Sequence, residues 1–311
     1  MTQNLSSSFH LSPEVANALS SHSPLVALET TVITHGLPAP QNLEFALEAE
    51  KIVKSKGVIP ATTALLEGKV MVGMKEEEFA ALVESPDPTK VSSRNLGICV
   101  AQNRSGGTTV AGTLVICRSV GIQVFATGGI GGVHRGSTFD ISADLDELAR
   151  SPVIVVCAGA KSILDLPATL EILETRGVPI IGYRTDEFPA FYSIHSRLPV
   201  DAVANDVGEV VAIAQAHWDL GLKSAVLVCV PPPSEIALDA GDVDKVLQKA
   251  MKQAESEGIT RGKITPYLLD KMKQLTGGKS LHTNLALLKN NVSLAAEIAN
   301  QMSGKTKLRS Y

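Results

Sequence analysis

Residues 153–162 read Val-Ile-Val-Val-Cys-Ala-Gly-Ala-Lys-Ser and carry the clearest structural signal in the chain. The run from Val153 to Cys157 is apolar without interruption, which is typical of a strand covered on both faces of a sheet. Apolar residues then recur at helical spacing over residues 162–176, and residues 179–183 predict another strand. A buried strand, a helix and a second buried strand form the repeating unit of a parallel sheet.

The same alternation continues in both directions along the chain. Further strands are predicted at residues 25–31, 58–65, 70–72, 123–126 and 225–230, and further helices at residues 42–55, 109–120 and 207–220. After Pro231-Pro232-Pro233 the periodicity is helical alone, over residues 242–257, 266–275 and 284–302. We therefore expect a single α/β domain over residues 1–311, with a mainly parallel sheet, a helical C-terminal segment and a partly flexible lead-in at residues 1–23, of which 1–10 are the most flexible.

The composition favours a small-molecule partner. A net charge of −4 argues against nucleic-acid binding, which requires clustered Lys and Arg. No apolar run reaches the ~18–20 residues of a membrane helix, so no membrane association is expected. The four cysteines lie far apart, without zinc or disulfide spacing, and are expected to be buried reduced thiols. Reduced thiols indicate an intracellular protein, with the cytoplasm as the expected location.

Residues 127–136, Thr-Gly-Gly-Ile-Gly-Gly-Val-His-Arg-Gly, follow a predicted strand. Glycines at the carboxyl end of a strand let backbone N–H groups approach an anion, and His134 and Arg135 add donors. The alternative is a tight glycine turn. Shortly afterwards Asp140 and Asp144 stand close enough in sequence to reach one cavity and suit magnesium or manganese. Helix capping by Ser142 or Asp140 is an equally good interpretation of that segment.

Three further charged residues stand out. Lys161 follows the buried strand and precedes the predicted helix, and both surroundings favour the neutral amine that attacks carbonyl-type carbons. A lysine that extends to the surface is the alternative. Glu29 lies within an otherwise uncharged strand, where a carboxylate is rare without a function. Lys90 lies in a hydroxyl-rich loop and suits a phosphate, although many loop lysines are simply solvated.

Together the segments 27–38, 90–92, 127–136, 139–144 and 157–165 resemble the pseudouridine-5′-phosphate glycosidase family, also called indigoidine synthase A-like. The resemblance extends from about Leu11 to Met302. It implies a three-layer α/β/α fold, a homotrimer and a divalent metal such as Mn²⁺ or Mg²⁺. Two residues depart from the family's usual Lys-Val-Ser-Arg-Arg-Asp-Leu: Ser93 replaces an arginine and Asn95 an aspartate, which affects the expected phosphate site.

The resemblance also implies individual roles. Lys161 matches the nucleophile that forms an imine with C1′ of the ribose, Glu29 the proton donor, and Asp140 the metal ligand, with Asp144 as an alternative ligand. The residues matched to substrate binding are Lys90, Val110 and His134 near the ribose phosphate, Thr127 and Asn284 near the base, and Ser142, Ala143 and Asp144 in one further segment.

The implied reaction is the reversible cleavage of the carbon–carbon glycosidic bond of pseudouridine 5′-phosphate to uracil and ribose 5-phosphate. That bond has no nitrogen leaving group to protonate, so a lysine imine beside it is a suitable electron sink. One alternative is a lysine-dependent aldolase or another sugar-phosphate lyase. A second is a non-catalytic sugar-phosphate-binding protein.

Overall fold

The computed structural model describes residues 5–136, 139–259 and 264–309. Within them one sheet has the strand order β1-β4-β3-β2-β7-β9-β13-β11-β12, with β6 paired to β3 and β5 to β6. Its strands are β1 (Phe9–Leu11), β2 (Leu25–Leu28), β3 (Ile59–Leu66), β4 (Lys69–Val72), β5 (Thr89–Val91), β6 (Gly106–Thr108), β7 (Val124–Ala126), β9 (Ile154–Cys157), β11 (Ile180–Tyr183), β12 (Ala202–Ala204) and β13 (Val226–Cys229). A separate antiparallel pair joins β8 (Val133–His134) to β10 (Leu164–Asp165).

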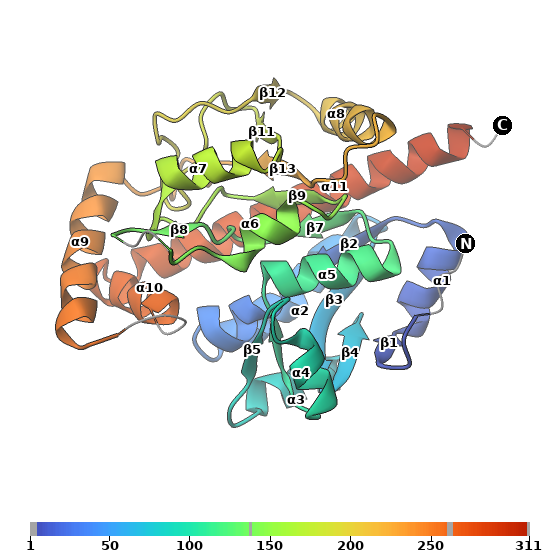
Figure 1. The fold of residues 1–311 in the computed structure, drawn as a ribbon, viewed down its shortest axis with the longest axis horizontal. Coiled ribbons are helices and arrows are strands. Elements are labelled where there is room, and N and C mark those ends of the chain that lie inside the picture. Colours follow the sequence, from blue (N-terminus) through green and yellow to red (C-terminus); the bar gives the residue numbers. More distant parts are fainter. Residues whose placement is uncertain (1–4, 137–138, 260–263, 310–311) are drawn as a thin grey trace.

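Helices cover both faces of this sheet. They are α1 (Pro13–Ser21), α2 (Gln41–Ser55), α3 (Glu76–Glu84), α4 (Leu96–Ala101), α5 (Val110–Val120), α6 (Ala143–Leu148), α7 (Leu166–Thr175), α8 (Val207–Asp219), α9 (Ala240–Ser256), α10 (Ile264–Leu275) and α11 (Lys279–Arg309), together with the π-helix η1 (Val32–Gly36). Figure 1 shows the long α11 passing behind the central strands while α5 and α6 lie in front of them. The expected three-layer α/β/α architecture with helical C-terminal segments is confirmed.

The central strands β3, β2, β7, β9, β13, β11 and β12 are parallel to their neighbours along the sheet. Within the described part of this sheet, the antiparallel pairs are those of β3 with β4 and with β6. Every residue of β9 and β13 is buried, as the uninterrupted apolar runs predict. Because these strands are parallel, their carboxyl ends meet along one edge, where ligands of such sheets bind.

Three boundaries differ from the sequence prediction. The strand expected over residues 25–31 ends at Leu28, because the chain turns into η1. The helix expected from Ser162 begins at Leu166, since Asp165 caps it by accepting the Ala168 N–H and proline occupies the first turn. The lead-in expected to be flexible contains β1 and α1, the latter capped by Ser12, whereas residues 1–4 lie outside the described part.

The sequence predicts no helix that crosses a membrane. Among the described residues, none of the helices combines the length and the apolar character that a membrane crossing demands.

Candidate active site

Four of the residues singled out in the sequence line one cavity at the carboxyl edge of the sheet. Glu29, Lys90, Lys161 and Asn284 surround a space of about 50 Å³. They come from distant parts of the chain: the end of β2, the strand β5, the segment after β9, and α11. The strand order β2-β7-β9 brings the first and third of these segments to the same edge.

Glu29 is a buried carboxyl group with one direct side-chain partner. It is 9% exposed and accepts a hydrogen bond from the Thr127 hydroxyl, at the end of the neighbouring strand β7. Burial raises the pKa of Glu29 above its usual value, although Lys161 and the Thr127 hydroxyl act to lower it. Glu29 therefore keeps its proton to higher pH than an exposed glutamate, as a proton donor needs.

The backbone that carries Lys161 is fixed from two sides. The Lys161 N–H donates to the Ile130 carbonyl at 3.1 Å, within the glycine-rich segment. The Arg135 guanidinium donates to the carbonyls of Ser162 at 3.2 Å and Leu164 at 3.0 Å. Because α7 begins only at Leu166, the expected immediate junction of Lys161 with a helix start is wrong.

Lys90 is a second half-buried amine in the same cavity. Burial, followed by the positive charge of Lys161, lowers the pKa of Lys90, while Asp144 and Glu29 act to raise it. Asn95, which stands where the family usually has an aspartate, has a structural role. Its side-chain amide donates to the Lys90 carbonyl at 3.1 Å and accepts the Ser92 N–H at 2.7 Å. An ionised aspartate could only accept, so the asparagine makes one contact that an aspartate cannot.

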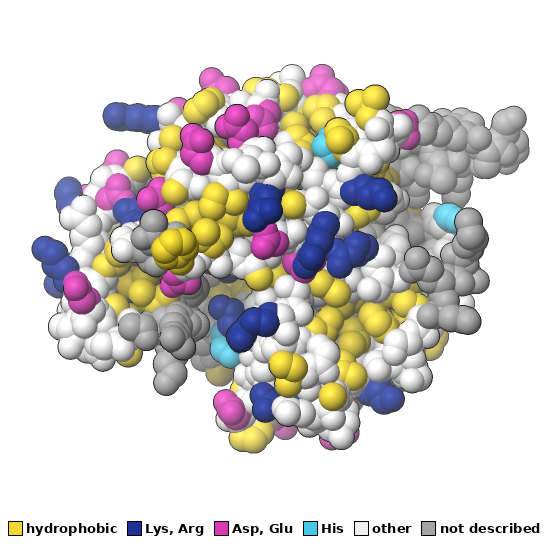
Figure 2. Space-filling model, viewed as in Figure 1, with side chains coloured by type: hydrophobic (Ala, Val, Ile, Leu, Met, Phe, Trp, Pro, Cys, Tyr) yellow, Lys and Arg dark blue, Asp and Glu magenta, His cyan; other side chains and the backbone are white. Residues whose placement is uncertain are grey.

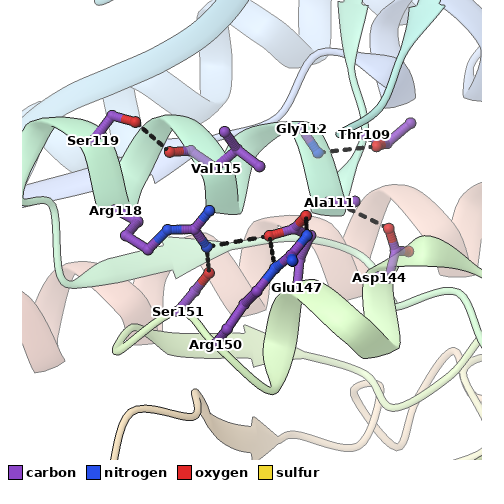
Figure 3. Close-up of polar contacts among 10 residues, drawn as sticks. All are labelled: Thr109, Ala111, Gly112, Val115, Arg118, Ser119, Asp144, Glu147, Arg150 and Ser151. Carbon is purple, nitrogen blue, oxygen red and sulfur yellow. Dashed lines mark hydrogen bonds and ion pairs between the residues drawn. The ribbon is translucent and has the colours of Figure 1, made fainter. Parts of the chain in front are cut away.

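The anion held by the glycine-rich segment is a carboxylate of the protein itself. Asp144 on α6 accepts the N–H of Ala111, in the first turn of α5, at 2.9 Å (Figure 3). It also accepts the N–H of Gly131 at 2.8 Å. A Cβ atom on Gly131 would lie 2.3 Å from the Ser142 hydroxyl, so only glycine fits there. Ser142 is the N-cap of α6, which confirms for this residue the capping interpretation.

Asp140 and His134 are joined through their backbones. The His134 N–H on β8 donates to the Asp140 carbonyl at 2.9 Å. Burial lowers the pKa of His134, and the Asp140 carboxylate opposes that effect. In the described part of the chain, no three His, Cys, Asp or Glu side chains gather as a ready-made metal cage. One carboxylate such as Asp140, completed by water and substrate oxygens, fits the way proteins commonly hold Mg²⁺.

The remaining expected residues are brought to the same area. Val110 is the first residue of α5 and is buried, Ala143 begins α6, and Thr127 follows β7. The Asn291 side chain on α11 holds the Thr127 carbonyl at 2.8 Å. Sequence reasoning missed this asparagine, because nothing in the periodicity of a helix indicates which distant loop it contacts.

Several further cavity residues had no assigned role in the sequence analysis, among them His35, Phe191, Leu269 and Leu288. His35 falls within the resembling segment 27–38, which was a usable signal. Phe191 adopts a positive φ of 63°, a conformation that bulky residues rarely take and that often marks a functional site. Leu269 and Leu288 have only the pattern of helix core residues.

A buried glutamic acid and a lysine lie together at the carboxyl edge of a doubly covered parallel sheet, an arrangement typical of an α/β enzyme. Comparison with known proteins identifies the family. The chain belongs to the indigoidine synthase A-like protein family, whose model matches residues 14–301.

Named relatives cover nearly the whole chain. It is 50% identical to the pseudouridine-5′-phosphate glycosidase of Geobacillus kaustophilus, over 94% of this chain and 98% of that protein. The enzyme of the same name from Herpetosiphon aurantiacus is 51% identical, over 93% and 96%. The solved prealnumycin C-glycosynthase AlnA, in complex with ribulose 5-phosphate, has a TM-score of 0.90 at 36% identity, over 99% of this chain and 100% of AlnA. An indigoidine synthase A-like protein from Thermotoga maritima has a TM-score of 0.85 at 38% identity, over 90% and 93%.

Proposed function

We propose that the chain is a pseudouridine-5′-phosphate glycosidase, which cleaves the carbon–carbon glycosidic bond reversibly to give uracil and ribose 5-phosphate. The observation that carries the proposal is that Glu29 and Lys161 line one cavity. The proposal is supported by relatives of this name at about half identity over nearly the full chain. The ribulose 5-phosphate bound to AlnA supports a sugar phosphate as the ligand class.

In the proposed mechanism the Lys161 amine forms a bond to C1′ while the bond from C1′ to the ring oxygen breaks, and the ring oxygen takes the proton of Glu29. The new ammonium returns a proton to Glu29. The nitrogen lone pair then forms the C=N bond as the bond from C1′ to C5 of uracil breaks. C5 receives the electron pair and a proton from Glu29. Water hydrolyses the resulting protonated imine, which releases ribose 5-phosphate and the free amine and returns a proton to Glu29.

The other residues have binding roles in this proposal. Lys90, His134 and Val110 bind the ribose phosphate end, and Thr127 and Asn284 lie near the base. Residues 142–144 position the sugar, with Asp144 acting through the backbone that it fixes. Asp140 would hold Mn²⁺ or Mg²⁺, and the ion, when bound, supplies positive charge beside substrate oxygens. Both Asp144 oxygens accept backbone N–H groups, so in this proposal Asp144 fixes the backbone and Asp140 is the metal ligand.

We extend the proposal to assembly and location. A homotrimer is supported by exposed apolar side chains beside Asp140: Phe139 is 92% exposed and Ile141 44%. Such groups gain from contact with another copy of the chain. The cytoplasm is supported by the four cysteines, all of which are buried free thiols.

The deciding experiment is incubation with pseudouridine 5′-phosphate and Mn²⁺, followed by chromatography for uracil. Uracil formation is expected with the natural chain and not with Lys161→Ala. A lysine-dependent aldolase would release no uracil from this compound. A non-catalytic binding protein would bind it unchanged.

A further inference from the structure

Glu29 borders two cavities. One is the catalytic cavity of about 50 Å³ that it shares with Lys161. The other, which we call the rear cavity, has a volume of about 20 Å³ and is lined mainly from β2, η1, α2 and α11. The residues common to the walls of both are Glu29, Val32 and Leu288. Glu29 therefore lies between the two spaces, and Val32 and Leu288 complete the wall that separates them.

The rear cavity has the size to hold one water molecule but not the chemistry to bind it. A buried water needs roughly 10–15 Å³ of such space and about two to four polar partners. The polar residues that line the rear cavity are Glu29, Thr62 and Thr127, and its other lining residues are apolar, such as Val292. Both threonine hydroxyls already donate, that of Thr62 to Glu50 at 2.8 Å and that of Thr127 to Glu29. A water in this space would find too few partners, so the rear of Glu29 is dry.

The position of Leu288 in the wall is fixed by its surroundings. A Cβ atom on Gly128 would lie 3.0 Å from a Leu288 methyl carbon, so the bare backbone of Gly128 lets Leu288 lie directly against the segment after β7. On the same helix, the Asn291 side chain donates to the Thr127 carbonyl at 2.8 Å. Leu288 and Asn291 are three positions apart on α11 and so share one of its faces. The hydrogen bond of Asn291 therefore helps to hold Leu288 in the wall.

The groups around Glu29 make its protonation sensitive to water. Burial, the largest influence, raises the pKa of Glu29. Asp144 also raises this pKa, and three neighbouring groups lower it: Lys161, the Thr127 hydroxyl and Lys90. Further titratable side chains near the walls of the two cavities are His35 on η1 and, behind Thr62, Glu50 on α2. Water behind the carboxyl group would remove part of the effect of burial and leave the lowering groups in place, so Glu29 would lose its proton at lower pH.

Resting on the proposed function, we propose that Leu288 and Val32 are positioning residues that act through Glu29, as a hydrophobic partition that keeps water from the rear of its carboxyl group. They take no part in the covalent steps at Lys161. The partition keeps Glu29 in the acid form that supplies protons to the ring oxygen and to C5 of uracil.

The test follows the proton of Glu29 directly, by infrared titration of the full chain without substrate. The signal of a protonated carboxyl group that is missing from Glu29→Gln belongs to Glu29. Leu288→Ala joins the two cavities into one space with room for several waters, so the pH at which this signal disappears is expected to fall by about one unit or more. Leu288→Met conserves the volume of the side chain and should keep the natural titration.

Turnover supplies a second measurement. In Leu288→Ala the alkaline limb of the pH–rate profile should move to lower pH by the same amount as the infrared titration. Damage to the packing of α11 alone would instead lower kcat at every pH and leave the limb in place.

Val292→Ala is the matched control, because Val292 lines the rear cavity and not the catalytic one. Its truncation enlarges the dry space without opening the wall and should leave the titration of Glu29 unchanged. Val32→Ala opens the wall from the η1 side and serves as the test if Leu288→Ala does not fold. A natural titration in the variant that opens the wall, or an equal shift in Val292→Ala, would overturn the partition. Failure of the natural chain to release uracil from pseudouridine 5′-phosphate would instead refute the proposed function, on which the infrared titration does not depend.

Discussion

Glu147→Gln tests how the α5–α6 contact supports the site. Glu147 is fully buried on α6 and accepts hydrogen bonds from Arg118 on α5, at 3.1 Å, and from Arg150 (Figure 3). In the view of Figure 2, Lys and Arg side chains gather near the middle of the face, over this contact. Because Asp144 lies on the same short helix, Glu147 also helps to hold that carboxylate against Ala111 and Gly131.

The expected loss of stability follows from the contacts. Hydrogen bonds to charged groups contribute ~1.5–3 kcal/mol and neutral ones ~0.5–1.5 kcal/mol, so a glutamine loses about 1 kcal/mol per bond. The side chains of Arg118 and Arg150 are 37% and 60% exposed, so water recovers part of the loss. We expect a decrease of about 1–3 kcal/mol in the free energy of unfolding. With an unfolding entropy of ~2.1 cal/mol/K per residue over 311 residues, that corresponds to roughly 1.5–5 °C in Tm.

The difference in unfolding free energy between the natural chain and Glu147→Gln should also depend on pH. Burial alone would raise the pKa of Glu147, but the hydrogen bonds from Arg150 and Arg118 outweigh it and lower that pKa below its usual 4.5. A carboxyl group with a lowered folded-state pKa contributes stability above the unfolded-state pKa and loses it as the pH falls through the folded-state value. The difference between natural chain and variant should therefore be full at pH 7 and shrink below about pH 4.5.

Urea unfolding of both proteins between pH 7 and pH 4 measures this difference. Glu171→Gln, at an exposed position of α7, is the matched control and should unfold like the natural chain. A gap between natural chain and Glu147→Gln that widens as the pH falls, or that is absent at pH 7, would refute the reasoning.

Four more outcomes test the proposed chemistry. Borohydride added during turnover should leave a ribose-phosphate adduct on the peptide of Lys161, and Lys161→Arg should fail because guanidinium stays protonated; an adduct on Lys90 in the mass spectrum would contradict this mechanism. The raised pKa of Glu29 should keep its acid form active to higher pH than an exposed glutamate allows. Thr127→Val removes a hydroxyl that lowers this pKa, so the alkaline limb of the pH–rate profile should move to higher pH; a move to lower pH would contradict the role of Glu29. Chelation should abolish turnover and Asp140→Ala should weaken the metal dependence; full activity in metal-free buffer is the opposing result. Lys90→Ala should raise KM for the phosphorylated substrate about tenfold or more, with little change for unphosphorylated pseudouridine, since one phosphate contact is lost; equal losses on both compounds would remove the phosphate assignment.

The layered fold was predictable because burial on both faces leaves a direct mark on the sequence. The strands β9, β11 and β13 lie within one residue of the predicted boundaries at each end. The start of α7 is also marked in the sequence, by Asp165 and Pro167, although the helical spacing predicts a start at Ser162. The helical spacing of apolar residues extends three residues before the cap, and the cap decides where the helix begins.

The convergence of the site residues was only partly predictable. Glu29 and Lys161 each follow a parallel strand, so both belong at the carboxyl edge, but periodicity does not reveal that β7 alone separates their strands. The capture of Asp144 by Gly131 depends on a loop conformation for which spacing gives no signal. Leu288 and Asn291 gain their roles from contacts with distant elements, which local patterns do not encode.

The order of elements along the chain has a consequence for how the enzyme is made. All strands of the described sheet precede α11, which packs on β2, β7 and β9 and contributes Asn284 and Asn291. A chain emerging from the ribosome can thus pair its strands while the apolar surface later covered by α11 is still open to water and to chaperones. Until that helix docks, the Thr127 segment lacks its anchor and the cavity lacks a wall. We therefore expect the nascent protein to gain activity only once α11 has docked.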